Sequence, residues 1–435
     1  MKNTISIYVH IPFCDKKCNY CDFYSIPKII ISEDLIKKYI DSLINELNFY
    51  APLFEFYDIQ TIYFGGGTPN SVGNYYLDYF LDSFFNNLLK SKNNILEKLE
   101  ETTIELNPQF ASTNQINIIK KYPINRISLG VQALDEKGLL FLGRNASFKQ
   151  SIEAINIVLS NFDNVSLDFI LGIPSLNIKK ELKKIVNLTS IYKSLNHLSF
   201  YILTIAEGTV LYNKLYYDNF SKNKNRKNNL LDRIEAKSVE DYLTVCEYLK
   251  KLDFQHYEIS NFSKEGKYSK HNLRYWDLKP YIGIGSSAHS YIFDLRYQNT
   301  CIKDYLSVWE KYSEITNTIS SYFDNDSNKF IISDEQQNDK LKNYLLSSMK
   351  LLKRSYEIID NKKKMNEYIL LKLRMKDGID LNEFKNIFFI DLLNEKEKEI
   401  TKYLEKNFIK IKKNRLSIEE SAFIFYNEIV QNLIF

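Results

Sequence analysis

The chain has 435 residues, of which 44% are hydrophobic and 26% are charged, and its formal net charge is +4. This composition is typical of an ordinary globular protein with a large core, which we expect to be divided between two domains. So small a net charge predicts no nucleic-acid or acidic-membrane partner, and no stretch reaches the about 18 apolar residues that a transmembrane segment needs.

The first segment, "MKNTISIYVHIPFC", alternates polar and apolar residues, which predicts a strand rather than a secretory signal. The chain has five cysteines, and three of them lie within eight positions at residues 14–21. This distribution does not resemble a disulfide framework, so we expect a reducing, cytoplasmic location. Cys246 and Cys301 stand alone and are expected to be ordinary thiols.

Six β-rich segments follow one another with room for a helix between them. They cover residues 4–11, 61–67, 102–108, 126–132, 164–174 and 197–204. Segments with helical periodicity, such as 34–50 and 149–162, lie between them. The alternation predicts an α/β fold with a parallel sheet and right-handed crossovers, in the form of a partial (βα)6 TIM-like barrel.

Polar residues gather at the ends of these predicted strands. The cysteines follow the first, "GGGTPN" the second, "NP" the third and Gln132 the fourth, while Asp168 lies within the fifth. In a β/α barrel the loops at this rim can vary without disturbing the packed strands. The pattern therefore predicts a single site lined by all of these elements.

The second half of the chain changes in character. Residues 218–229 are rich in Lys and Asn, which predicts a surface loop, and after about residue 325 charged helices are expected. "FIKIKKNRLSI" predicts a hairpin with its turn at Asn414, followed by a helix from Glu419. We expect a barrel domain over residues 1–300 and a winged-helix-like α+β domain over 325–435, the latter with a structural or partner-binding role.

Cys14, Cys18 and Cys21 have the spacing Cys-x3-Cys-x2-Cys. Three thiolates on a four-iron cluster leave one iron open to a further ligand. A structural zinc normally needs four ligands, and no fourth cysteine lies nearby; His10 could serve, but it lies on the predicted strand. The spacing alone leaves a zinc knuckle open.

This spacing, with Tyr20 before the last cysteine, resembles the signature of the radical S-adenosylmethionine (SAM) superfamily. The resemblance implies a [4Fe-4S] cluster whose open iron is chelated by the amino and carboxylate groups of SAM. It also implies that "GGGTP", whose glycines allow close approach of a ligand to the backbone, binds the amino end of SAM. The candidates in that loop are Gly66, Gly67 and Thr68.

The resemblance narrows to the subgroup that contains the oxygen-independent coproporphyrinogen III dehydrogenases and the HemW-type haem chaperones. "YVHIPFC", "GGGTP", "ELNP", "RISLGVQ", "LGR" and "LDFILGIP" match that subgroup in order. The SAM contacts that it implies are Tyr8, Tyr20, Gly66, Thr68, Glu105, Gln132, Arg144 and Asp168. Ala146 and Ala206 depart from the pattern, which has His and Glu at these positions.

Two features favour the chaperones over the dehydrogenases. Phe23 stands where the dehydrogenase pattern has a further cysteine, and the motif starts after only 13 residues. "HNLRYW" matches the His-Asn-x-x-Tyr-Trp motif of the chaperones. The resemblance implies that His271 is the haem ligand, since a neutral imidazole binds haem iron well. Asn272, Tyr275 and Trp276 would shape its pocket.

Four other histidines are assigned more simply. His289 is expected near SAM at the mouth of the barrel, whereas His10, His197 and His256 are expected to have structural roles. The resemblance thus implies a haem chaperone that delivers haem to acceptor proteins such as respiratory enzymes, with a cluster-dependent homodimer as a plausible form. The alternatives are a coproporphyrinogen III dehydrogenase and a tRNA-modifying radical SAM enzyme, against which the modest charge speaks.

Overall fold

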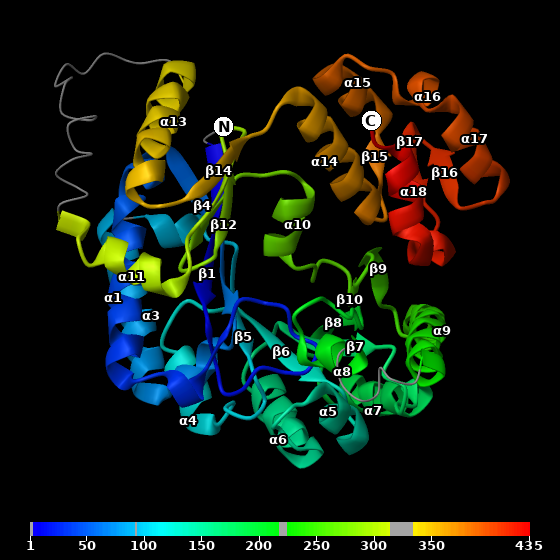
Figure 1. Cartoon of the computed structure of the whole chain (residues 1–435), viewed down its shortest axis with the longest axis horizontal. Coiled ribbons are helices and arrows are strands. Elements are labelled where there is room, and N and C mark those ends of the chain that lie inside the picture. Colours follow the sequence, from blue (N-terminus) through cyan, green and yellow to red (C-terminus); the bar gives the residue numbers. More distant parts are fainter. Residues whose placement is uncertain (1–2, 92–93, 217–223, 314–333) are drawn as a thin grey trace.

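The computed structural model describes residues 3–91, 94–216, 224–313 and 334–435 (Figure 1). Six adjacent parallel strands form the centre of its large sheet. They are β1 (Asn3–Ile11), β4 (Tyr57–Gly66), β5 (Glu101–Leu106), β6 (Arg126–Gln132), β7 (Val165–Leu171) and β8 (Leu195–Ile202). They lie in chain order, which confirms the predicted alternating α/β fold.

Further strands extend both ends of this sheet. Beyond β1 lie β11 (Tyr281–Ile284), which is parallel to it, and the antiparallel strands β12 (His289–Ile292), β13 (Leu295–Gln298) and β14 (Ser355–Ile358). Beyond β8 lie the antiparallel strands β10 (Asn261–Ser263) and β9 (Gln255–Glu258). These short strands were not predicted, because three or four residues carry too little periodicity to recognise.

Helices cover the outer face of the sheet (Figure 1). The main ones are α1 (Glu33–Phe49), α3 (Asn74–Ser91), α4 (Thr113–Ile119), α5 (Glu136–Leu142), α6 (Phe148–Leu159), α7 (Ile178–Ile191) and α9 (Lys224–Lys250). In α1 the buried side chains recur at helical spacing, as at Ile36, Ile40, Leu43 and Leu47, because one face packs on the strands. The Ser32 side chain accepts a hydrogen bond from Leu35 N and so fixes where α1 begins.

Shorter elements complete this part of the chain. They are β2 (Phe13–Cys14), β3 (Ile26–Pro27), α2 (Ala51–Phe56), α8 (Val210–Tyr216), α10 (Lys270–Trp276), α11 (Ile302–Trp309) and α13 (Asp334–Leu351), with 3-10 turns at Lys28–Ile30, Pro69–Val72 and Ile95–Lys98. The predicted loop at 218–229 was wrong for residues 224–229, which belong to α9, and residues 218–223 lie outside the described part of the chain.

The C-terminal part is a small α+β unit. It comprises α14 (Asn361–Arg374), β15 (Ile379–Asp380), α15 (Leu381–Phe388), α16 (Leu392–Glu395), α17 (Glu397–Glu405), β16 (Ile409–Lys412), β17 (Arg415–Ile418), a 3-10 turn at Glu420–Phe425 and α18 (Tyr426–Leu433). The turn of the predicted hairpin falls at Lys413 and Asn414, whose φ angles are 50° and 61°. The boundary near residue 325 stays a prediction, and β14, beyond it, still pairs with β13.

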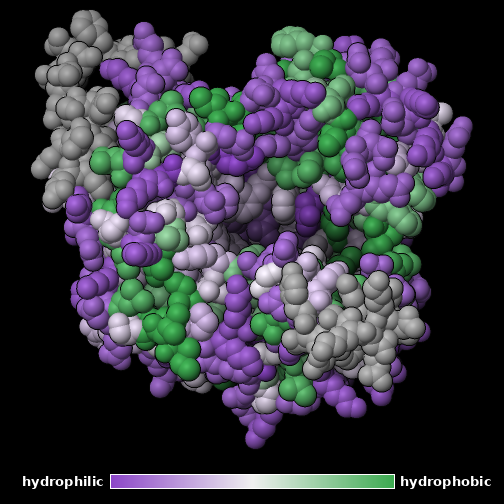
Figure 2. Space-filling model, viewed as in Figure 1, coloured by the Kyte–Doolittle hydropathy of each residue, from purple (hydrophilic) through white to green (hydrophobic). Residues whose placement is uncertain are grey.

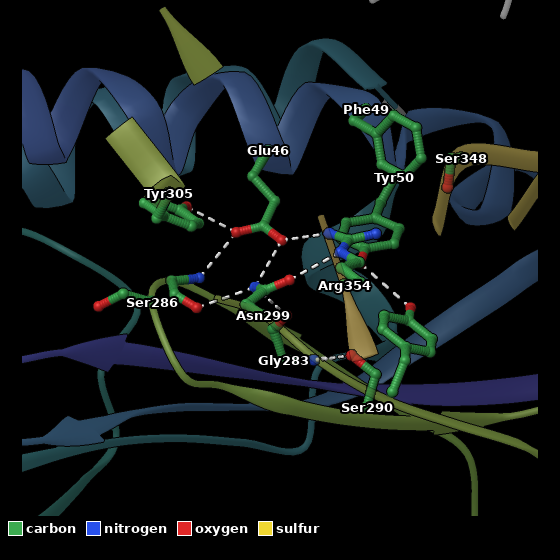
Figure 3. A network of polar contacts seen from close by, with 12 residues as sticks. Glu46, Phe49, Tyr50, Gly283, Ser286, Ser290, Asn299, Tyr305, Ser348 and Arg354 are labelled. Carbon is green, nitrogen blue, oxygen red and sulfur yellow. Dashed lines mark hydrogen bonds and ion pairs between the residues drawn. The ribbon is translucent and has the colours of Figure 1, made fainter. Parts of the chain in front are cut away.

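A buried network of polar contacts ties α1 to the loop before β12 (Figure 3). The Glu46 carboxylate accepts hydrogen bonds from Gly285 N at 2.7 Å, from the Tyr305 hydroxyl at 2.6 Å and from the Asn299 amide at 2.8 Å. It also pairs with Arg354 at 2.5 Å, and both side chains are almost fully buried. The Glu46 carboxylate therefore holds together segments that are far apart in the sequence, around residues 285, 299–305 and 354.

Within the described residues, no helix is both long and apolar enough to cross a membrane.

Candidate functional site

A cavity of about 430 Å³ lies at the carboxyl ends of the parallel strands. Nearly all of the predicted cluster and SAM residues line it. They are Cys14, Cys18, Tyr20, Cys21, Gly66, Gly67, Thr68, Glu105, Gln132, Arg144 and Asp168. They come from segments spread over residues 14–168, so only the barrel topology brings them together. This confirms that the polar residues at the strand ends meet in one place.

The cysteines lie on a loop that crosses this cavity. Cys14 ends β2, and its sulfur lies 3.3 Å from the Thr68 hydroxyl, while the backbone N–H of Cys21 donates to Cys18 O at 3.3 Å. Burial raises the pKa of the Cys14 thiol, and it raises that of Cys21 to about 11. The thiolates therefore need a nearby positive charge, such as bound iron, to form at neutral pH.

The sulfur positions bear on which metal centre fits. Among the residues that the structure describes, no three His, Cys, Asp or Glu side chains are placed to hold one metal ion together. In a four-iron cluster each thiolate binds a different iron, so the sulfurs need not converge on one point. The donor set of three cysteines, with no fourth ligand placed beside them by the described residues, therefore fits a cluster with an open iron better than a structural zinc ion.

The glycine loop after β4 is fastened to the cysteine loop. Gly67 N donates to Ile11 O and Thr68 N to Phe13 O, both at 2.8 Å. A Cβ atom on Gly66, whose φ is 113°, would lie 2.7 Å from His10 Nδ1, and one on Gly67 would lie 2.8 Å from Phe13 O. Only glycine can bring this loop so close to residues 10–13, and Gly66 and Gly67 also line the cavity.

Arg144 places a positive charge beside the cysteines. Its Nη1 lies 3.9 Å from Cys18 Sγ, and its Nη2 donates to Gly130 O at 2.8 Å and to Asn107 Oδ1 at 3.1 Å. Its Nε is buried and has no hydrogen-bond partner within the described residues. This guanidinium can stabilise thiolates and can also donate to a carboxylate in the cavity.

Two carboxyl groups lie across the cavity floor. Glu105 accepts a hydrogen bond from the Tyr63 hydroxyl at 2.7 Å, and burial raises its pKa to about 7. Asp168 accepts from Ser128 at 2.7 Å and from Ser166 at 2.8 Å. Such groups can accept hydrogen bonds from an amino group or from ribose hydroxyls.

The sequence-based reasoning missed several residues of this cavity. Tyr63, Asn107, Ser128 and Tyr201 also line it. Asn107 lies within the "ELNP" segment and could have been named from it. Tyr63, Ser128 and Tyr201 lie on strands, where alternate side chains face the same side, but which side faces the barrel interior depends on the register.

A second cavity, of about 730 Å³, adjoins the first, and both are lined by Asp22 and Phe23. Seven of its lining residues are aromatic apart from histidine: Tyr8, Phe23, Tyr24, Tyr275, Trp276, Tyr281 and Tyr291. Figure 2 shows this face of the molecule hollowed near its centre, where Figure 1 places α10 between the sheet and α14. Tyr8, predicted as a SAM contact, and His289 line this second cavity and not the one with the cysteines.

His271 is buried, with an exposed fraction of only 1%. Its Nδ1 lies 2.8 Å from the Thr61 hydroxyl, and its Nε2 lies 2.8 Å from the Tyr275 hydroxyl. Both ring nitrogens are thus occupied, and an iron could bind only after one of these contacts breaks. Its role as a haem ligand stays a prediction, as does that of the half-buried Asn272.

His10, His197 and His256, which were expected to have structural roles, are hydrogen-bonded within the fold. His10 is hydrogen-bonded to Tyr24 O at 2.9 Å, His197 to the Tyr257 hydroxyl at 2.8 Å, and His256 to Ile259 O at 3.1 Å. All three are buried, and burial lowers the pKa of each of them. They are therefore neutral at pH 7 and act through packing and hydrogen bonds.

Comparison with known families gives two matches along the chain. Residues 8–188 match the Radical SAM superfamily, and residues 359–425 match the HemN C-terminal domain. The first match contains the cysteines and all lining residues of their cavity up to Ile170, but not Tyr201 to Thr204, and the second covers most of the small C-terminal unit.

Curated relatives extend the similarity over the whole chain. The chain is 28% identical over 433 residues to the protein named "Heme chaperone HemW" of Lactococcus lactis, with 99% of this chain and 97% of that protein covered. It is 33% identical over 354 residues to the HemW of Buchnera aphidicola from Acyrthosiphon pisum, with 80% and 83% covered. For the HemW of Bacillus subtilis the identity is 33% over 306 residues, with 70% and 75% covered.

Among solved structures, coproporphyrinogen III oxidase (HemN) from Escherichia coli, described as a radical SAM enzyme, superposes with a TM-score of 0.68. The superposition covers 100% of this chain and 90% of that one, at 16% identity. At this identity the likeness shows a shared fold and no more.

Proposed function

The chain belongs to the HemW family of the radical SAM superfamily, and on that premise we propose that it is a haem chaperone, which binds haem and delivers it to respiratory haem enzymes. The observation that carries the proposal is the similarity to a HemW protein over 99% of this chain. A match to one domain alone could reflect only a common fold. The match over the whole length also includes the "HNLRYW" segment and the C-terminal unit.

We propose further that Cys14, Cys18 and Cys21 hold a [4Fe-4S] cluster and that SAM binds its open iron. When bound, the cluster supplies the electron that can cleave the sulfonium of SAM. The chain's own part is to hold these groups: Arg144 offsets the negative charge of the thiolates, and the glycine loop, which lines the same cavity, would hold the amino end of SAM. Glu105 would accept a hydrogen bond from SAM.

Phe23 supports the chaperone over the dehydrogenase. It lies between the two cavities, lines both of them and has an exposed fraction of 66%. A phenyl ring offers an apolar surface for a flat ligand but neither a proton nor an electron, whereas the dehydrogenase pattern has a thiol at this position. Porphyrinogen oxidation would therefore lack a reactive group that the pattern of the dehydrogenases includes.

The proposal is tested by offering the chain the substrate of the rival activity. The protein, reconstituted with iron and sulfide under anaerobic conditions, is incubated with SAM, a low-potential reductant and coproporphyrinogen III. We expect no protoporphyrinogen, while ferric haem added to the same preparation binds at one per chain. Formation of protoporphyrinogen over many turnovers would overturn the chaperone assignment.

A further inference from the structure

Of the residues predicted to hold the cluster or to lie at SAM, only Tyr8 and His289 line the aromatic cavity of about 730 Å³. Its volume is typical of cofactor sites, which range from about 300 to about 1,000 Å³. Aromatic side chains come from β1, the cysteine loop, α10 and the strands beyond β1, so the walls suit a flat apolar ring. The indole Nε1 of Trp276 is buried and has no partner within the described residues.

His289 is the side chain in this cavity that is free to bind a metal. It is exposed, it begins β12, and neither of its ring nitrogens has a hydrogen-bond partner among the described residues. His10 also lines the cavity, but Tyr24 O and the Tyr8 hydroxyl occupy its two nitrogens. Partial loss of hydration and the nearby Arg296 lower the pKa of His289, so its imidazole is neutral and can donate a lone pair.

The loop that precedes His289 is held by several hydrogen bonds. Glu46 accepts from Gly285 N at 2.7 Å, and the Tyr39 hydroxyl accepts from Ser286 N at 2.9 Å. Asn299 N donates to Ala288 O at 2.9 Å, which fixes the residue next to His289. The network in Figure 3 therefore fixes the backbone that leads to His289 before any ligand arrives, which reduces the entropy lost on binding.

The charged side chains that line the cavity differ in whether they are free to pair with a ligand. Arg296 already pairs with Glu367 at 2.7 Å and with Glu357 at 3.2 Å. Lys279 is exposed, lines the cavity and forms no ion pair within the described residues. Asp22 also lines the cavity and would repel a carboxylate near it. Lys279 is therefore the cation that a carboxylate of a bound ligand can reach.

We propose that haem binds in this aromatic cavity, with His289 as the iron ligand and Lys279 as the partner of a propionate carboxylate. The proposal rests on the proposed function and adds its binding site. The role of His271 is then indirect. Its Nε2 lies 2.8 Å from the Tyr275 hydroxyl and so positions Tyr275, which lines the cavity. The adjoining cavities would place haem beside the cluster site, separated from it by Phe23 and Asp22.

The test titrates ferric haem into the reconstituted full chain and records difference spectra against the haem-free protein. We expect His289→Ala to raise the Kd about tenfold or more and to abolish the spectrum of histidine-ligated haem. Free imidazole added to His289→Ala should restore that spectrum, which a merely structural role of His289 would not permit. His271→Ala, where it folds, should keep the ligated spectrum.

A second measurement tests the lysine. Lys279→Gln should weaken haem binding up to about fivefold, and the weakening should disappear with haem dimethyl ester, which has no free carboxylates. Lys267→Gln is the matched control, since Lys267 is exposed and does not line this cavity.

The possible outcomes distinguish an error in the proposed binding site from an error in the proposed function. If the wild type binds haem and His289→Ala keeps both its affinity and its spectrum, the site is wrong while the proposed function stands. Loss of the ligated spectrum in a folded His271→Ala variant, with His289→Ala unaffected, overturns the site in favour of His271. If the wild type binds no haem at all, both the site and the proposed function fail.

Discussion

His271 Nε2 lies 2.8 Å from the hydroxyl oxygen of Tyr275, one helical turn further along α10. On its other side the ring is held by Thr61 of β4 at 2.8 Å, and the backbone N–H of His271 donates to Glu101 of β5 at 3.0 Å. The histidine of the "HNLRYW" segment thus connects α10 to two barrel strands. This relationship indicates that it positions Tyr275 in the wall of the aromatic cavity.

The first prediction concerns this connection. His271→Ala should lower the free energy of unfolding by about 1–3 kcal/mol, because it leaves the Tyr275 hydroxyl without its partner, whereas the Thr61 hydroxyl keeps its hydrogen bond to Ser6. Urea unfolding of the full chain measures this loss. His289→Ala is the control and should leave stability nearly unchanged, since its side chain is exposed. Equal stability of the two variants would contradict the positioning role of His271.

The second prediction concerns the metal centre. Replacing Cys14, Cys18 or Cys21 singly by Ser should reduce the iron and sulfide bound after anaerobic reconstitution to a small fraction of the wild-type amount. Cys301→Ser is the control, because Cys301 is exposed and lies outside the cluster cavity. A cysteine variant that retains a full complement of iron would show that the three thiolates do not hold the cluster.

The third prediction concerns the glycine loop. Gly66→Ala should abolish measurable SAM binding, since the new Cβ would lie 2.7 Å from the buried ring of His10. Gly73→Ala is the matched control: its φ is also positive, at 90°, but nothing lies within 4 Å of the added atom. The control should lose about 1–2 kcal/mol of stability from backbone strain and keep its SAM affinity. Calorimetric titration with SAM would contradict the account if both variants bind equally well.

The strands and the cluster cavity could be predicted because their signals are local. Alternation, β-branched residues and the polar residues at strand ends identified all six central strands, and the family resemblance then implied eleven of the residues that line the first cavity. The second cavity could not be predicted, because it depends on where α10, β12 and α14 come to lie relative to β1. His271 shows the same limit: its motif is visible in the sequence, but its burial follows from contacts with Thr61 and Glu101, over 150 residues away.

The fourth prediction is a pH dependence of SAM binding. Burial raises the pKa of Glu105 to about 7 in the ligand-free protein, so below pH 7 the carboxyl is largely protonated. The proposed hydrogen bond from SAM needs the carboxylate form, so binding at low pH should release a proton. SAM affinity should therefore fall about tenfold per unit below pH 6 and level off above pH 8. Glu105→Gln should bind more weakly, with no such slope; a slope that persists in this variant would assign the proton elsewhere.

The fifth prediction concerns the buried ion pair behind the His289 loop. Arg354→Met leaves the Glu46 carboxylate buried without its cation and should cost about 3–5 kcal/mol of stability. The double variant Glu46→Leu with Arg354→Met should recover much of this loss, because no charge is left unpaired. Glu247→Ala removes an exposed pair with Lys251 and is expected to cost less than about 1 kcal/mol. If the double variant loses as much stability as Arg354→Met alone, hydrogen bonds and not charge pairing dominate the network.

Haem delivery is the central claim, and transfer from the loaded chain measures it most directly. The reconstituted protein carrying one haem is mixed anaerobically with the haem-free form of a respiratory haem enzyme, and absorption spectra and acceptor activity are followed together. We predict that haem leaves this chain and that the acceptor becomes active faster than with the same amount of free haem. Haem that stays on the chain, or an acceptor activated no faster than by free haem, would contradict the account.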